Sequence, residues 1–191
     1  MESRLFQALK AFKGADGCEA NLFEEFKKIA EAAFFSGYFL INGGCKDAYK
    51  LKLTCIEFYY HEDDGNIKDE KKYLKGKDEF GYALGAVCPN PSGVDVLFDD
   101  PQKKYHASFL IRGYKAIEPG KKEWENNEKE KNWAPHDFWY DLFGGANMLS
   151  NGKFSIEWID ESDETLGYAE PMQRINIEDN RLWGFKRVEK L

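Results

Sequence analysis

Hydrophobic residues recur at helical spacing in one early segment of the chain. Between Ala20 and Phe35 they fall on a single stripe of a helix. The stripe consists of Leu22, Phe26, Ile29, Ala30, Ala33 and Phe34. Such a stripe is typical of an amphipathic helix. Asn21 and Glu24 resemble an N-terminal capping pair, and Gly37 follows the last apolar position. The pattern predicts a helix over residues 20–35.

Shorter apolar runs between turn residues predict strands over much of the remaining chain. Residues 38–42 and 48–60 flank a Gly43-Gly44 turn, and VDVLF (94–98) with YHASFLIRGYKAI (105–117) is typical of a hairpin. Three further strands are expected at FSIEWI (154–159), RINI (174–177) and LWGFKRV (182–188). Strands thus outnumber helices, which predicts an α+β fold.

Polar segments interrupt this pattern. Residues 61–79 are charged and are expected to form a solvated loop or a short helix. Residues 118–132 form a second polar segment, which is expected to be a helix or a loop. Residues 134–149 are expected to contain a helix that ends near Gly144-Gly145. Because we find no repeat and no obvious linker, we expect one domain over residues 1–191.

One acidic residue stands in the run LKLTCIEFYY, residues 51–60. Side chains of a regular strand alternate between faces, so Leu51, Leu53, Cys55, Glu57 and Tyr59 are expected to share a face. Four of these five suit an interior, and Glu57 does not. Either Glu57 lies where the strand emerges into solvent or pairs with a buried Lys or Arg, or it is held among aromatic side chains as a general base.

Composition indicates a folded globular protein. The 191 residues are 42% hydrophobic and 16% aromatic. No apolar run approaches the ~20 residues of a membrane span, and the N-terminal segment lacks the apolar core of a signal peptide. The four cysteines form no CxxC pair, so reduced thiols are expected. We therefore expect a cytoplasmic monomer without membrane contact.

Charge and motif content narrow the possible functions. The net charge is −7, whereas proteins that hold duplex DNA usually carry a basic surface, so a role on nucleic acid requires a local basic patch. The three histidines, His61, His106 and His136, have no metal-ligand spacing. No phosphate-binding, dinucleotide-binding or serine-hydrolase motif is present. No metal and no cofactor is therefore expected.

The segment CIEFYY is similar to the ETEAY strand of the 3-methyladenine (alkyladenine) DNA glycosylases. Five further segments resemble motifs of that family in the same order, from about residue 26 to 187. They are FKKIAEAAFFSGYFLIN, CPNPSGVDVLF, FLIRGYKAIEPG, FGGANMLSNGKFSI and PMQRINIEDNRLWGF. The resemblance implies a methylpurine-glycosylase-like fold, with a curved mixed or antiparallel sheet and peripheral helices, and a role in base excision repair of DNA damage.

The resemblance also assigns roles to individual residues. Glu57 falls on the glutamate that activates water, and Tyr59 on the tyrosine that stacks on the flipped base. Lys115 falls on an arginine that helps to hold the water, and Arg112 could supply that role in a different strand register. The further candidates for the base pocket are Phe58, Tyr60 and His61.

Two departures from the family pattern concern DNA. No residue stands at the spacing of the family histidine, and His61 comes too early to replace it simply. The hairpin after VDVLF is too short to carry the family's DNA-wedging tyrosine. We therefore expect hydrolysis of the N-glycosidic bond of a damaged (alkylated or deaminated) purine in duplex or single-stranded DNA, or in a nucleoside. The alternative is a catalytically silent relative that binds a nucleoside, a small ligand or a protein partner.

Overall fold

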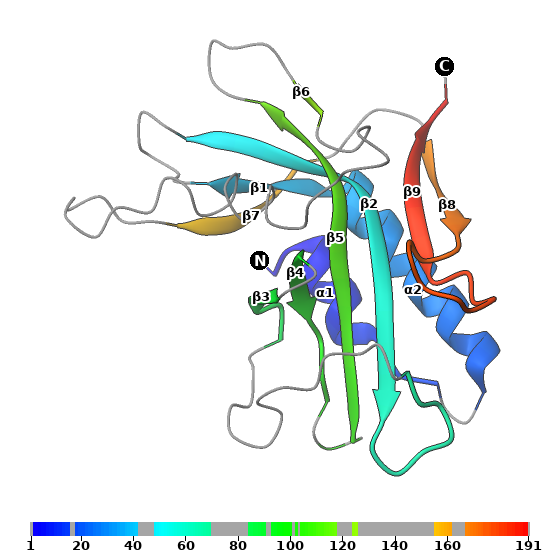
Figure 1. Ribbon diagram of the computed structural model, residues 1–191. Helices are drawn as coiled ribbons and strands as arrows, with labels where there is room; N and C mark the ends of the chain where they lie inside the picture. Colours follow the sequence, from blue (N-terminus) through cyan, green and yellow to red (C-terminus); the bar gives the residue numbers. More distant parts are fainter. Residues whose placement is uncertain are drawn as a thin grey trace.

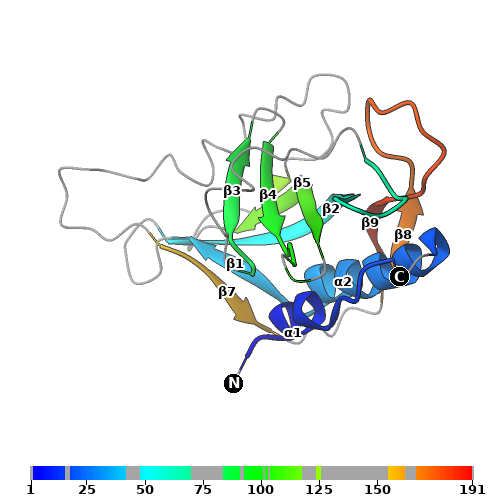
Figure 2. The same cartoon turned by 90° about the horizontal axis from the view of Figure 1, so that it is seen from below.

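The structure, a computed structural model, describes residues 2–15, 18–41, 48–69, 84–90, 93–100, 102, 104–117, 124–125, 155–161 and 167–190. These residues form a single α+β domain in which an open antiparallel sheet carries two helices on one side (Figures 1 and 2). The helices are α1 (Arg4–Ala11) and α2 (Glu19–Phe35). The strands are β1 (Gly37–Ile41), β2 (Tyr49–Glu62), β3 (Val87–Asn90), β4 (Gly93–Leu97), β5 (Tyr105–Ile117), β6 (Trp124–Glu125), β7 (Ile156–Asp160), β8 (Gly167–Met172) and β9 (Gly184–Glu189).

The two long strands β2 and β5 form the centre of the sheet. Along the main path the order is β3-β4-β5-β2-β1-β7. One edge of β2 pairs with β5, and the opposite edge has two different partners. On this opposite edge the first residues of β2, up to Leu51, pair with β1, whereas Cys55 to Glu57 pair with β9. Strand β9 in turn pairs with β8. The sheet therefore divides into two branches along β2, between Leu51 and Cys55.

Two β-bulges lie at this branch point. Strand β2 has one extra residue, Thr54, between the pairs Leu53–Tyr114 and Cys55–Gly113. Strand β5 has one extra residue, Arg112, before the next pair, Ile56–Ile111. An extra residue moves all later side chains of its strand to the other face. The strands return to their original register after the second bulge, but both have exchanged faces.

This exchange overturns the expectation that Leu51, Leu53, Cys55, Glu57 and Tyr59 share a face. The core cluster contains Leu51 and Leu53 before the bulge and Ile56, Phe58 and Tyr60 after it. We call this side of the sheet the helix face, because Phe58 stacks on Phe26 of α2 with ring centroids 4.4 Å apart. The opposite side, which carries Glu57, Tyr59 and His61 after the bulge, is the polar face.

Helix α2 covers the helix face of the sheet. Its buried residues are Leu22, Phe26, Ile29, Ala30, Ala33 and Phe34, which confirms the predicted stripe. The predicted cap is wrong, because the N-cap residue is Cys18, without a side-chain hydrogen bond. Asn21 instead donates to the backbone oxygen of Ala15 (3.3 Å). In Figure 1, α2 passes behind β2 and β9, so the polar face looks toward the viewer.

The predicted strands agree with the structure except at one place. Strands β1, β2, β7 and β9 confirm four of them, and β4 pairs with β5 as the predicted hairpin. The RINI segment is not a strand but part of the connection between β8 and β9, residues 173–183. Arg174 turns inward there to form ion pairs, while Ile175 stays exposed. The expected helix within residues 134–149 and residues 70–79 of the charged segment lie outside the described residues.

Four elements were not predicted from the sequence, among them the two-residue strand β6, which pairs with β5 within the polar segment 118–132. Helix α1 begins at the N-cap Ser3, whose Oγ accepts from the backbone N–H of Phe6 (3.1 Å), and it buries Leu5 and Leu9. Strand β3 contains Cys88 and Pro89 and was not predicted. Strand β8 has no apolar alternation in sequence and was not predicted.

The stacked pair of Phe26 and Phe58 gives a test of the core. Replacing Phe26 by Ala removes a fully buried ring, so we expect a loss of unfolding free energy of about 3–5 kcal/mol. Urea denaturation measures it. Leu182→Ala is the control, since Leu182 is 44% exposed, and it should change stability by less than about 0.5 kcal/mol. Equal effects of the two substitutions would contradict the described core.

Candidate active site around Glu57

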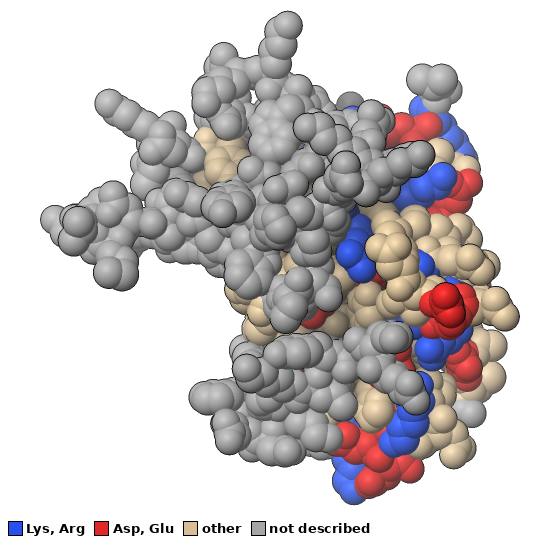
Figure 3. Space-filling view, in the orientation of Figure 1, with Lys and Arg blue, Asp and Glu red and all other residues tan. Residues whose placement is uncertain are grey.

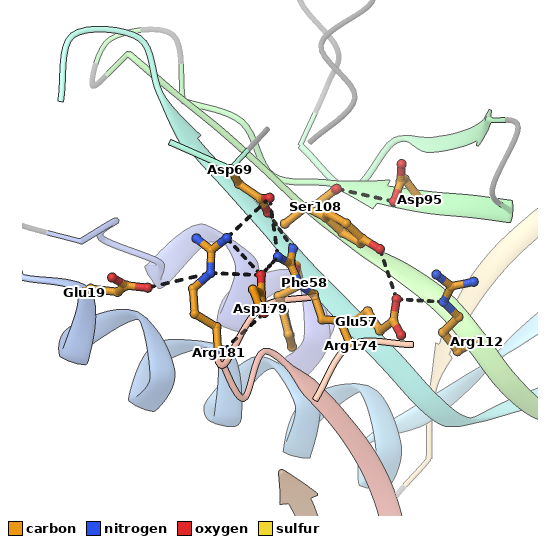
Figure 4. A network of polar contacts seen from close by, with 11 residues as sticks. Glu19, Glu57, Phe58, Asp69, Asp95, Ser108, Arg112, Arg174, Asp179 and Arg181 are labelled. Atoms are coloured by element: carbon orange, nitrogen blue, oxygen red, sulfur yellow. Dashed lines mark hydrogen bonds and ion pairs between the residues drawn. The ribbon is translucent and has the colours of Figure 1, made fainter. Parts of the chain in front are cut away.

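Glu57 lies on the polar face with none of its surface exposed. Its Oε2 accepts from Nε of Arg112 (2.7 Å) and from the hydroxyl of Tyr59 (3.0 Å). Its Oε1 accepts from the backbone N–H of Ile175. Figure 4 shows Arg112 beside this carboxylate. The sequence left open whether Glu57 reaches solvent, pairs with a buried cation or is held among aromatic side chains. The structure shows that Glu57 pairs with a buried arginine, in an aromatic neighbourhood.

The β5 bulge supplies this arginine. Arg112 is the extra residue of the bulge, and such a position commonly redirects a side chain. Burial alone would lower the pKa of Arg112, but the charge of Glu57 and the bonds to Glu57 and Tyr59 outweigh it and raise that pKa above its ordinary value. Arg112 is therefore a permanent cation, and the pair brings opposite charges together away from water.

Tyr59 stays a hydrogen-bond donor in this arrangement. Burial, followed by the negative charge of Glu57, raises the pKa of the Tyr59 phenol above its ordinary value. The guanidinium of Arg174 lies over the ring, 4.8 Å from its centroid, and the residue is 7% exposed. One face of the ring is thus occupied by a planar cation, so a base could stack only on the other face.

The chain between β8 and β9, residues 173–183, closes over Glu57, and we call it the β8–β9 loop. At one end, the oxygen of Trp183 accepts from the backbone N–H of Phe58 (2.7 Å). Gly184 lies opposite Glu57 in the strand register, and a Cβ added there would come within 3.0 Å of the oxygen of Met172. The absence of a side chain at Gly184 therefore allows the end of β8 to lie close to β9, opposite Glu57.

A buried ion-pair network fixes the loop to the end of β2. Arg174 Nη1 donates to Asp69 Oδ2 (2.6 Å) and to the backbone oxygen of Phe58 (3.2 Å). Both charged side chains of this Arg174–Asp69 pair are fully buried. Arg174 also pairs with Asp179, which Arg181 contacts at 2.9 Å (Figure 4). Removing one partner of such a pair is costly, so the base of the loop is held firmly.

A second buried carboxylate lies in the same row of the polar face. Asp95 of β4 and Glu57 of β2 are both opposite Leu110 of β5. Asp95 is 7% exposed and its Oδ1 accepts from Oγ of Ser108 (3.3 Å). Two acidic residues therefore flank Leu110 on one face of the sheet.

The remaining predicted residues divide between the two faces. Phe58 and Tyr60 belong to the core on the helix face, where the Tyr60 hydroxyl accepts from the backbone N–H of Ala15 (3.1 Å). His61 is on the polar face, and burial followed by the charge of Lys68 lowers its pKa. Lys115 lies opposite Lys52, beyond the bulge from Glu57. The structure thus brings Arg112 to the carboxylate.

Two contacts of the site escaped the sequence reasoning. The backbone N–H of Ile175 cannot be recognised by residue type, and Asp69 lies in a segment expected to be solvated. Both Arg174 and Ile175 lie in the RINI segment, which the apolar pattern predicted to be a strand.

The described part of the chain shows no grouping of three or more His, Cys, Asp or Glu side chains suited to a metal ion. Nor does any helix among the described residues have the length and apolarity to cross a membrane. On the face shown in Figure 3, Lys and Arg atoms of the described residues are intermixed with Asp and Glu atoms rather than gathered in a continuous basic surface.

Comparison with known proteins finds no matching family model, no matching curated protein and no matching solved structure.

The Glu57–Arg112 pair can be tested by a double-mutant cycle. Arg112→Met should cost about 3–5 kcal/mol of unfolding free energy, because it leaves a buried carboxylate without its cation. In the double variant Arg112→Met/Glu57→Gln no charge remains, so most of this loss should be recovered. Denaturant unfolding of the four proteins gives the coupling energy. Additive effects would show that the two side chains are not coupled.

Cys55 gives a chemical test of the surroundings of Glu57. Burial, followed by the charge of Glu57, raises the pKa of the Cys55 thiol to about 12. Since the thiolate is the reactive form, at about pH 8 only about one thiol in ten thousand is reactive. Iodoacetamide should therefore modify the exposed Cys18 long before Cys55, as followed by peptide mass spectrometry. Equal rates would be incompatible with the raised pKa of the Cys55 thiol.

Proposed function

We propose that the protein hydrolyses the N-glycosidic bond of a damaged, alkylated or deaminated purine, with Glu57 as the group that activates water. The observation that carries this proposal is the convergence of Arg112 and Tyr59 on Oε2 of a carboxylate that is shielded from bulk water. These donors fix one oxygen, and the other, Oε1, would act on a water molecule once the backbone N–H of Ile175 no longer occupies it. The glycosylase-like fold and the resemblance of six segments belong to the same proposal.

The chemistry needs no group beyond those of the chain. Glu57 takes a proton from water while the water oxygen bonds to C1′ of the sugar. The C1′–N bond breaks and its electron pair leaves with the base: a positively charged N-alkylated purine leaves as a neutral base, and a deaminated purine leaves as an anion that takes up a proton from solvent. The carboxylate also stabilises the positive charge that develops on the sugar in the transition state. Arg112 holds Glu57 in place, and the base would stack on the face of the Tyr59 ring opposite Arg174, where stacking contributes about 1–3 kcal/mol.

A second candidate, a catalytically silent relative that binds a ligand or partner, is favoured by one specific observation. Glu57 has no exposed surface, and three donors already occupy its oxygens. A carboxylate that serves only as a structural acceptor would have this environment. For hydrolysis, the cover over Oε1 must move to admit water.

Base release from defined substrates distinguishes the two candidates. The panel contains an alkylated purine and hypoxanthine, each in duplex DNA, in single-stranded DNA and as a nucleoside. We expect release of the free base, measured by chromatography, and a decrease of at least about 100-fold in Glu57→Gln, since a general base typically contributes 10²–10⁴-fold. Glu31→Gln, the same change on the exposed side of α2, should leave the rate unaltered.

The opposite outcome is equally defined. No release from any substrate by the folded protein would support the silent relative, in which Glu57→Gln should only lower the unfolding free energy, because it leaves the buried Arg112 without its carboxylate.

A further inference from the structure

Glu57 lies only one backbone layer below the surface. The N–H of Ile175 reaches Oε1 of Glu57, whereas the residue Ile175 is itself 41% exposed. A single stretch of main chain therefore contacts the buried carboxylate on one side and the solvent on the other. Displacing that stretch would expose Oε1 without disturbing the sheet.

The stretch is bounded by two fixed residues. Arg174 is held by Asp69 and by the Phe58 carbonyl, and Asp179 is held by Arg174 and Arg181. Because Arg174 and Asp179 also pair with each other, the intervening residues 175–178 form a small loop closed at its base by an ion pair.

Residues 175–178 themselves have few holding contacts. Ile175, Asn176 and Glu178 are exposed, and Ile177 is half-buried. Asn176 has a positive φ of 59°, which turns the chain back sharply. Within this stretch, the hydrogen bond from Ile175 to Glu57 is the contact that reaches the sheet, and the Ile177 carbonyl accepts from the backbone of Asp179 (3.0 Å).

The acceptor positions of the Glu57 carboxylate indicate which of its three hydrogen bonds a ligand replaces. A carboxylate offers about four acceptor positions, and Glu57 uses two on Oε2 and one on Oε1. Loss of the Ile175 donor leaves the Arg112–Glu57–Tyr59 cluster unchanged, whereas loss of either other donor breaks it. The amide of Ile175 is thus the donor that can be exchanged at least cost.

We propose that residues 175–178 are a lid over Glu57, hinged at Arg174 and Asp179, and that water or an N–H group of the bound ligand takes the place of the Ile175 amide on Oε1. The ligand part of this inference rests on the proposed hydrolase function, whereas the lid does not. Opening breaks one hydrogen bond to Glu57 and keeps the buried ion pairs, so it requires much less than global unfolding.

Amide hydrogen exchange of the unmodified protein, followed by NMR, tests the lid. The N–H of Ile175 and that of Phe58, which donates to Trp183, are both bonded in the closed structure. The lid predicts that Ile175 exchanges on the order of 100-fold faster than Phe58, because the first opens locally and the second only with larger unfolding. Equal exchange rates would overturn the lid.

A matched pair of variants tests the contact of the lid with Glu57. Ile175→Pro deletes the N–H, and Ile175→Ala keeps it while removing the same exposed side chain. Coupling of an amine to carboxylates with a water-soluble carbodiimide should label Glu57 several-fold faster in the proline variant, as measured by peptide mass spectrometry. Equal labelling of Glu57 in two folded variants would contradict the proposal, and the exchange experiment decides if the proline variant does not fold.

The two proposals fail separately. Fast exchange at Ile175 without base release would support the lid and contradict the proposed hydrolase function. Base release with equal exchange rates would support the hydrolase function and contradict the lid.

Discussion

The paired bulges at Thr54 and Arg112 are the constraint on which the rest of the structure depends. They let β2 and β5 stay in register while both strands exchange faces, so that Leu53 and Phe58 can contact the same core. The exchange also moves Glu57 out of that core and onto the polar face. The same irregularity lies where β2 changes its neighbour from β1 to β9. One local departure from pleating thus sets the sheet's branching and the position of its acidic residue.

Burial of charge and burial of Trp183 in the core together determine the β8–β9 loop. The loop exposes Ile175 and Leu182 but buries the guanidinium of Arg174 completely. An arginine in this position requires acceptors, and it finds them in Asp69, Asp179 and the Phe58 carbonyl. Glu57 has the complementary requirement for donors, which Ile175 partly meets. Each buried charge is therefore paired with groups of the segment that covers it, with Nε alone of the Arg174 guanidinium left without a hydrogen-bond partner among the described residues. The end of β2 and the loop thus specify each other's conformation.

The parts of the fold that depend on regular periodicity could be predicted from the sequence, and those that depend on an irregularity could not. Helix α2 and the β4–β5 hairpin follow from local patterns, and both were expected near their observed bounds. A bulge, by contrast, is visible in the sequence only as a break in the alternation of apolar and polar residues along a strand. Glu57 was singled out for that reason, but its face was assigned wrongly. Its partner Arg112 was named as an alternative to Lys115, and the choice between them depends on strand register, which single-strand patterns do not contain.

Charge limits the substrate within the proposed activity. Binding of duplex DNA gains much of its affinity from neutralised phosphates, which requires several cations on one surface. The chain carries −7, and the described residues of the face in Figure 3 mix both signs. The two arginines nearest to Glu57 are already committed to carboxylates, Arg112 to Glu57 and Arg174 to Asp69 and Asp179. Recognition at this site would therefore depend on the base and its sugar more than on phosphates, and a single-stranded or nucleoside substrate fits that balance better than a duplex.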